Sequence, residues 1–549
     1  MLLKGNVFMS IKLFRLNFKL IFRSLVYWLF IAVMLGGYVF FTYALQSLSY
    51  YSNYVYFFDS LTYMDATMYV LLFCVAMFFS QHKTTLEDVC FVPPGKTVCV
   101  KFLSVLACSS LICVIPLLFM LFAGLAEKVG AVYMLVSIIY GVVRWLVIII
   151  ISQTAGFFIG YVVRSVYSYL FAIPFAILNT FLNKYMFQWI FGYDIGRFYK
   201  YANFFSTQHK YSDGMPVTYR GPVVDTEFFV KSAVAVFLLI TVFFIILQLA
   251  RKKVTLKPMC AASASAVMLV LLSVFYFRLH PEVYYNEQKL YITDYEEQPY
   301  EITSYSGDIS LKEWAEYDVA VGVKGTGDAD SVTLRLDESL DIKSLEIGGR
   351  TADFERNGDL LTVHCTDSEF VMELCCRGRI SYVNSINVTD IYTDRLSCAL
   401  PPDFAFLPKV DGDKSTKRYE LDVKCANTLV SNLDTLERDG VYKISGSAEN
   451  ICFFSGFLTQ TERDGITFYH AKYDILNDIE RSYKNIRENS KVMFDHEKNS
   501  FTEKKWDEKP KVFIITYFYG TNGFAAPYED YVMMNFGYCD IPRKSYVEN

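Results

Sequence analysis

The chain has 549 residues, of which 53% are hydrophobic and 17% aromatic, and both fractions exceed those of an ordinary soluble globular protein. Charge is divided unevenly: 22 basic and 9 acidic residues occur up to Arg278, and 30 basic and 48 acidic residues from Leu279 onward. A basic apolar first half and an acidic polar second half predict a membrane domain joined to a soluble one. The acidic half lacks the basic surface that nucleic-acid binding requires, so a nucleic-acid partner is excluded.

The first residues combine basic side chains with an apolar face. In "SIKLFRLNFKLIFRSL" the basic residues recur at helical spacing, with leucine, isoleucine and phenylalanine opposite them. This predicts an amphipathic helix over residues 1–24 that lies in the inner headgroup region of a bilayer; an ordinary positive flank before a first span is the alternative. The residues predicted at the membrane interface are Lys12, Arg15, Lys19 and Arg23.

Seven stretches are apolar over roughly the twenty residues that crossing a bilayer requires. They are Leu25–Leu45, Leu61–Ser80, Phe102–Leu125, Trp145–Val163, Tyr167–Ile190, Phe228–Ala250 and Ala261–Phe277. The first six form a predicted transmembrane domain over residues 25–255, and the seventh is an added helix over residues 256–280. A shorter apolar stretch, Val132–Val143, is interpreted as a re-entrant or interfacial helix, with an extension of the next span as the alternative.

The short loops indicate an orientation, because cytoplasmic loops are rich in Lys and Arg. Basic residues precede the first span and follow the second, fourth and sixth, which predicts a cytoplasmic N-terminus in the plasma membrane. Seven spans then place the domain over residues 281–549 outside the cell. The long loop Asn183–Glu227 is the exception, because it is external in this topology and still carries five basic residues.

The polar loop "QHKTTLEDVCFVPPGKTVCVK" separates the second and third predicted spans. Thr84 or Thr85 can cap a short helix, and acidic residues that follow favour its positive N-terminal end. The prolines and glycine at residues 93–95 end that helix, and lysines lead into the third span. The loop therefore presents a short helix on the cytoplasmic face.

This loop resembles the one between the second and third spans of ATP-binding-cassette permeases of the ABC-2 exporter class. The matching positions are Thr85, Glu87, Pro93, Lys96 and Lys101. In that family the loop is a coupling helix that rests in a cleft of the ATPase subunit, and an amphipathic connecting helix precedes the first span. The resemblance covers about residues 1–255; an ordinary polar membrane loop is the alternative. The residues that it implies for ATPase docking are Thr85, Glu87, Asp88, Pro93 and Lys96.

The resemblance implies a separate ATPase subunit and a second permease subunit, identical or different, as partners in the lipid bilayer. The chain has no phosphate-binding loop of the Gly-x-x-x-x-Gly-Lys-Ser/Thr type, so we expect ATP to be bound by the partner and this chain to need no cofactor.

Few other residues of the membrane half suggest a role. Gly156 and Gly160 form a Gly-x-x-x-Gly pattern for close helix packing, which we expect within one chain rather than at a dimer seam. Arg144 is interpreted mainly as an interface anchor whose side chain reaches the headgroups. The alternative is a polar pathway marked by Arg144 and Gln153.

The second half shows the alternation of strands. "YDVAVGVKG", "SVTLRLDESL", "SLEIGG", "DLLTVHC" and "FVMELCCRGRISYV" predict an antiparallel sandwich between about Glu301 and Val423, continued by later strands to about residue 475. An apolar stripe predicts a helix over Ile475–Arg487, and a buried strand starts at Lys511. The predicted fold class is an α-helical polytopic membrane domain, with six core spans plus one, followed by a mainly β extracytoplasmic domain.

The stretch "VTLRLDESLDIKSLEIGGRTADFERNGDLLTVHC" is similar to the saddle-like N-terminal β domain of zinc peptidases of the aminopeptidase N type. Permeases fused to such ectodomains are a bacterial arrangement. The His-Glu-x-x-His pair of zinc ligands that catalysis needs is missing, because "HEKNS" has Ser500 at the second ligand position. We therefore expect no metal and no peptidase activity; the chain is a truncated relative, or the domain is retained for binding or shielding.

These observations predict the permease subunit of an ATP-driven exporter that is not itself an enzyme. A membrane-anchored extracytoplasmic binding or sensor protein is the alternative, and an external metallopeptidase is a third hypothesis. Neither the transported substrate nor its direction follows from the sequence.

Overall fold

The computed structural model divides the chain into two compact units. A helical unit comprises residues 1–209 and 226–281, and a β unit comprises residues 210–225 and 282–549. The structure describes residues 2–47, 54–82, 94–126, 128–180, 182–191, 199–206, 219–221, 226–251, 256–279, 283–284, 299–325, 331–364, 367–383, 389–463, 465–472, 492–495, 500–503, 510–515, 525–528 and 530–535.

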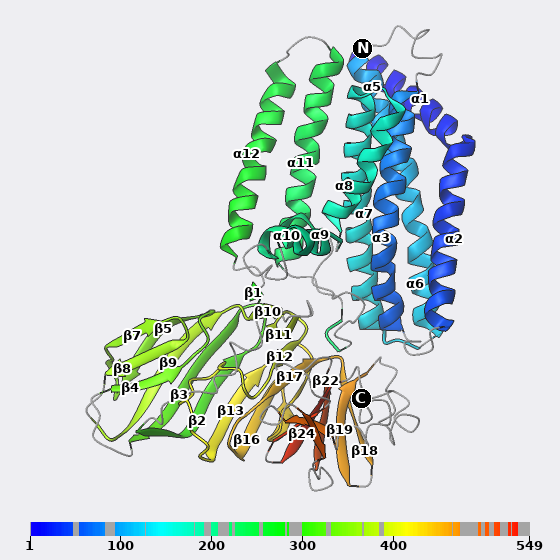
Figure 1. The fold of residues 1–549 in the computed structure, drawn as a ribbon. Helices are drawn as coiled ribbons and strands as arrows, with labels where there is room; N and C mark the ends of the chain where they lie inside the picture. The colour runs from blue at the N-terminus through cyan, green and yellow to red at the C-terminus, as the bar shows by residue number, and fades with distance from the viewer. Residues whose placement is uncertain are drawn as a thin grey trace. The chain divides into compact units, whose positions relative to one another are not determined.

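The helical unit is a bundle of long antiparallel helices (Figure 1). In chain order the helices are α1 (Leu2–Phe22), α2 (Leu25–Ser47), α3 (Tyr54–Gln81), α5 (Pro94–Ser110), the 3-10 helix η1 (Leu111–Cys113), α6 (Val114–Ala126), α7 (Ala131–Val162), the 3-10 helix η2 (Val166–Phe171), α8 (Ala172–Asn179), α9 (Leu182–Phe191), α10 (Tyr199–Phe205), α11 (Thr226–Arg251) and α12 (Leu256–Arg278).

The long helices are apolar enough to cross a bilayer. Within the described residues five helices meet the length and hydropathy of a span, or six if α1 and α2, which meet at an angle of 60°, count as one. α5 and α6 together form one of the five, and the turn of η1 between them lies next to Pro116. A proline has no N–H to donate to the preceding turn, which favours such a local change of helix geometry.

Two predicted segments differ from the structure. Val132–Val143 is not a separate re-entrant or interfacial helix; it is the first part of α7, which continues unbroken to Val162, so the alternative of an extended span is confirmed. Tyr167–Ile190 is not one span, because it is divided into η2, α8 and α9. At the end of α8 the Thr180 hydroxyl and the Asn183 amide donate to main-chain carbonyls of that helix, 2.8 Å and 3.0 Å away. Such side-chain donors compete with helical hydrogen bonds, so the helix ends there.

The described strands of the β unit form five sheets. The largest has eight strands in the order β15 (Asp434–Arg438), β16 (Val441–Ala448), β13 (Lys417–Lys424), β2 (Tyr300–Ser310), β3 (Ala315–Gly325), β9 (Glu369–Gly378), β5 (Leu340–Ile347) and β6 (Arg350–Thr351). A three-stranded sheet contains β4 (Ser331–Arg335), β8 (Leu360–His364) and β7 (Phe354–Asn357).

The other sheets follow the second part of the unit. A six-stranded sheet has the order β1 (Val283–Tyr284), β10 (Ser381–Val383), β11 (Thr389–Thr393), β12 (Cys398–Leu400), β17 (Phe453–Gly456) and β14 (Thr428–Val430). A five-stranded sheet has the order β18 (Leu458–Arg463), β19 (Ile466–Ala471), β22 (Lys511–Ile515), β24 (Tyr531–Asn535) and β23 (Ala525–Pro527), and β20 (Val492–Asp495) pairs with β21 (Ser500–Glu503).

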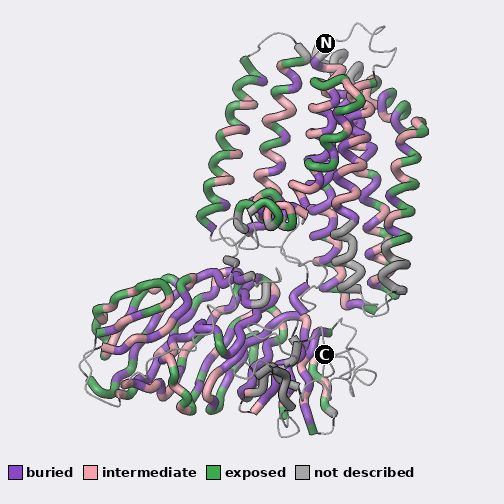
Figure 2. The backbone as a smooth tube through the Cα atoms, viewed as in Figure 1, coloured by how far each residue is buried: buried purple, intermediate pink, exposed green. Residues whose placement is uncertain are grey.

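One face of the eight-stranded sheet forms the main core. Its alternate residues are buried, as in β3, and pack against apolar residues of the three- and six-stranded sheets (Figure 2). The predicted strands of this region are therefore present, but the sheet is not purely antiparallel. β2 and β13 run parallel, with Tyr305 opposite Tyr419 and their rings stacked 5.1 Å apart. The helix predicted over Ile475–Arg487 lies outside the described residues.

Candidate functional site

The polar loop predicted to dock an ATPase lies mostly outside the described residues. This holds for Thr85, Glu87, Asp88 and Pro93. Lys96 is half-buried in the first turn of α5, which starts at Pro94 rather than at the predicted start of the third span. A proline suits the first turn of a helix, because the N–H that it lacks has no helical partner there.

The two ends of this loop are fixed to each other and to a neighbouring turn. The Nζ atom of buried Lys101 donates a hydrogen bond to the carbonyl oxygen of His82 at 2.6 Å. The Gln81 amide donates to the carbonyl of Val163 at 3.1 Å and to the hydroxyl of Ser168 at 3.0 Å. The first and last residues of the loop are therefore fixed at one end of the bundle, where α3 and α7 end and α5 begins.

The basic N-terminal helix α1 packs against α5, the helix that follows this loop. The Ser104 hydroxyl of α5 donates to the Phe14 carbonyl of α1 at 3.4 Å, and Asn17 and Ile21 of α1 are buried. The residues predicted for the membrane interface, Lys12, Arg15, Lys19 and Arg23, are all exposed. α1 therefore has one packed face and one basic face that remains open to a bilayer surface.

A buried ion pair joins α3 and α7. The Nε atom of Arg144 lies 2.6 Å from Oδ2 of Asp65, and a second guanidinium nitrogen contacts the same oxygen. Arg144 is 3% exposed and Asp65 is fully buried, so the prediction that Arg144 is an interface anchor is wrong. Asp65 had no role in the sequence analysis; a single acid inside an otherwise apolar span is the pattern that points to it.

The same two helices approach closely at the predicted glycine pattern. A Cβ atom at Gly156 would overlap the carbonyl group of Phe73, and one at Gly160 would lie 2.8 Å from the carbonyl oxygen of Met77. Gln153 donates to the hydroxyl of Ser109 on α5 at 2.7 Å. Both glycines therefore lie on the face of α7 that packs against α3 within this chain.

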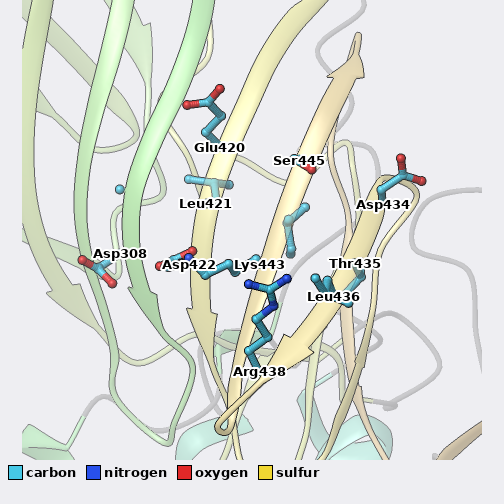
Figure 3. Close-up of a pocket in the computed structure, with 12 residues that line it drawn as sticks. Asp308, Glu420, Leu421, Asp422, Asp434, Thr435, Leu436, Arg438, Lys443 and Ser445 are labelled. Carbon is cyan, nitrogen blue, oxygen red and sulfur yellow. Dashed lines mark ion pairs between the residues drawn. The ribbon is translucent and has the colours of Figure 1, made fainter.

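An open recess lies on the polar face of the eight-stranded sheet (Figure 3). It has a volume of about 640 Å³ and is lined by strands β2, β13, β16 and β15. Asp308, Asp422 and Lys443 are opposite one another in register, and Lys443 lies 3.8 Å from Asp422. A second recess of about 310 Å³ also borders Asp308. Such a surface suits a polar ligand with charges of both signs.

Among the described residues no group of three or more His, Cys, Asp or Glu side chains is placed to hold a metal ion. Buried His470 has protein partners at both ring nitrogens, the carbonyl of Ala471 at 3.0 Å and the hydroxyl of Thr461 at 3.1 Å. Burial lowers the pKa of His470, which favours its neutral form. The His-Glu pair that precedes Ser500 lies outside the described residues.

Among known proteins, only solved structures show a similarity to this chain. No family model and no curated protein matches the chain. Solved structures of LTA4 hydrolase and of an M1 zinc metallopeptidase match over the C-terminal β region. Yeast LTA4 hydrolase in complex with bestatin is 13% identical with a TM-score of 0.29, over 45% of this chain and 44% of that one. The M1 zinc metallopeptidase of Deinococcus radiodurans is 9% identical with a TM-score of 0.31, over 46% of this chain and 64% of that one. The matched region thus spans less than two thirds of each of these proteins.

Proposed function

We propose that this chain is the permease subunit of an ATP-driven transporter, an exporter of the ABC-2 class, that couples to a separate ATPase through residues 81–101. It works with a second permease subunit, and ATP is bound by the ATPase subunit. The observation that carries this proposal is the fixation of both loop ends, through Lys101, His82 and Gln81, on the group of helices α3, α5 and α7. Because the loop ends are fixed on α3, α5 and α7, a movement that the ATPase imposes on the loop is transmitted to these helices.

The helices α11 and α12 indicate that the β unit and the loop before α11 lie on the same side of the bilayer. Residues 219–221 belong to the β unit, as do the residues that follow α12. If α11 and α12 both cross the bilayer, these two parts of the chain lie on the same side. An external position for both parts, with a cytoplasmic N-terminus in the plasma membrane, needs one more crossing between α7 and α9, and we propose that the broken segment η2–α8 supplies it.

A second candidate function is favoured by the recess on the eight-stranded sheet. Its charged lining, including Asp308, Asp422 and Lys443, is open to solvent and suits a membrane-anchored binding or sensor protein. In that case the helices serve as an anchor, and no ATPase accompanies the chain. In both cases the peptidase-like β domain acts without peptide hydrolysis.

A charge reversal in the loop distinguishes the two functions. We expect Glu87→Arg combined with Pro93→Ala to abolish both co-purification of an ATPase and substrate-dependent ATP hydrolysis. The changes remove the acid expected to stabilise the predicted docking helix and the proline predicted to end it. The matched control is Glu127→Arg, a charge reversal between α6 and α7 in the sequence, which should leave the ATPase bound. Full retention of a coupled ATPase by the loop variant would contradict the proposal.

A further inference from the structure

Three residues from the middle of the membrane half lie inside the β unit. Tyr219, Arg220 and Gly221 follow α10 in the chain and precede α11, yet all three are buried among residues of the β unit. Tyr219 belongs to an apolar cluster with Phe454 and Phe513. The segment is thus an integral part of the β unit and not a surface loop.

Arg220 is held by a buried ion pair and an aromatic ring. Its Nε atom lies 2.9 Å from Oδ2 of Asp394, and the side chains are 2% and 6% exposed. Its guanidinium carbon lies 3.8 Å from the centre of the Tyr392 ring, which is a favourable cation–π distance. The other carboxylate oxygen of Asp394 accepts hydrogen bonds from the N–H groups of Leu396 and Ser397, both at 2.9 Å. Asp394 is therefore held by its own turn as well as by Arg220.

The main chain on either side makes a second connection. The N–H of Phe457 donates to the carbonyl of Tyr219 at 2.8 Å. Gly456 has φ of +153°, and a Cβ atom there would lie 2.5 Å from that carbonyl oxygen. A glycine is needed at this close approach. We call Tyr392, Asp394, Gly456 and Phe457 the Arg220 socket.

Short stretches of chain join this segment to the hairpin of α11 and α12. Four residues separate Gly221 from Thr226, the first residue of α11, and four separate Arg278, the last of α12, from β1. Four residues span a limited distance even when fully extended. Within the helical unit, the Tyr276 hydroxyl near the end of α12 lies 3.4 Å from the carboxylate of buried Glu227 in the first turn of α11.

We propose that the Arg220 socket couples the β unit to α11, so that the first turns of α11 are held while residues 219–221 are seated and loosen when the segment leaves. Removing Arg220 would leave Asp394 buried without its cation, so the seated state is strongly favoured. A change in the β unit that releases the segment thereby reaches α11 through the chain. This coupling does not depend on whether the helices transport a substrate.

Hydrogen–deuterium exchange on the purified full-length chain tests the coupling. Arg220→Met removes the guanidinium group that pairs with Asp394. Gly456→Ala adds a methyl group that would overlap the Tyr219 carbonyl oxygen. We expect both variants to raise the exchange rate at least tenfold at Phe457 and over residues 228–234 of α11, with residues 64–81 of α3 unchanged. The controls are Arg418→Met, whose side chain is 73% exposed, and Gly446→Ala, whose φ is +144° but whose nearest neighbour is a Leu433 side chain.

The pattern of exchange decides the outcome. Faster exchange at Phe457 with unchanged α11 would overturn the coupling, because the segment would then be seated without an effect on the helix. If Arg220→Met destabilises the whole β unit, Arg220→Lys replaces it, because it keeps a cation for Asp394 and loses the guanidinium contact with the Tyr392 ring. Faster exchange at both Phe457 and α11 in that variant supports the proposal. Faster exchange at Phe457 alone, or unchanged exchange at both places, overturns it.

Discussion

The two helix pairs α3–α7 and α11–α12 are built differently. α3 and α7 approach so closely that glycine is needed at residue 156. A buried ion pair and a hydrogen bond from the Gln153 amide to the Leu72 carbonyl add polar contacts between them. α11 and α12 share a hydroxyl contact between Thr241 and Ser265 at 2.8 Å, and only 11% of the most apolar part of α12 is buried, against 50% for α3 and for α7. Figure 2 shows the contrast in burial.

This contrast indicates which helices of the bundle are held together most firmly. Between helices in a lipid environment the hydrophobic effect supplies little attraction, so close backbone packing and polar contacts determine which pairs stay together. By this criterion α3 and α7 form the more firmly fixed pair, and the hairpin α11–α12 is held by looser contacts of its own.

The largest expected effect comes from Arg144→Met. The variant leaves Asp65 buried without its cation, which should lower the free energy of unfolding by about 4 kcal/mol. Adding Asp65→Leu should recover most of this loss, because the unpaired charge is removed. Thermal unfolding in detergent measures both, with the exposed Arg164→Met as control. An Arg144→Met protein as stable as the control would show that the pair does not hold α3 and α7.

Gly156→Ala compares the two helix pairs directly. The added methyl group meets the Phe73 backbone, which cannot move without separating α3 from α7, so we expect a loss of about 3 kcal/mol. Gly36→Ala in α2 meets nothing within 4 Å and should be neutral. In the other pair, Thr241→Val removes only a hydroxyl contact and should cost less than about 1 kcal/mol. Equal losses for Gly156→Ala and Thr241→Val would remove the distinction between core and hairpin.

A buried acid, Asp337, makes the stability of the β unit depend on pH. The Asp337 carboxylate accepts hydrogen bonds from the Ser339 N–H at 3.0 Å and the Tyr382 hydroxyl at 2.6 Å, and burial raises its pKa to about 6. A folded-state pKa above the unfolded one means that stability is lost as pH rises between about 4 and 6.

Asp337→Asn removes this pH dependence. Relative to the unmodified chain, the variant should gain about 2 kcal/mol of stability between pH 4 and pH 7. The control is Asp341→Asn, at a side chain that is 71% exposed, and it should change little. Denaturant unfolding of the β unit in the full chain at both pH values measures the difference; parallel curves for the Asp337 variant and the unmodified chain would contradict it.

Length and apolarity predicted most of the long helices, because a bilayer sets a minimum length that is visible in the sequence. They did not predict the break after α8, which depends on the hydrogen bonds of Thr180 and Asn183. Arg144 was misplaced for a related reason. It ends a short apolar stretch in the sequence but lies within a continuous helix, opposite an acid 79 residues earlier.

In the β unit, alternation predicted the strands but not their partners. Nothing local distinguishes the parallel pair β2–β13 from an antiparallel one, since both alternate in the same way. The pairing of Arg220 with Asp394 joins residues 174 positions apart, and "TYRGP" has no pattern that indicates it. The docking residues Thr85, Glu87, Asp88 and Pro93 remain predictions.

The most direct test of the proposed function is purification of the tagged full-length chain from its native cell in mild detergent, followed by mass spectrometry of what accompanies it. We expect an ATPase with a phosphate-binding loop, in an amount comparable to the chain. A chain that is purified alone, in intact and monodisperse form, would contradict an ATP-driven permease and favour a membrane-anchored protein that acts through its β unit.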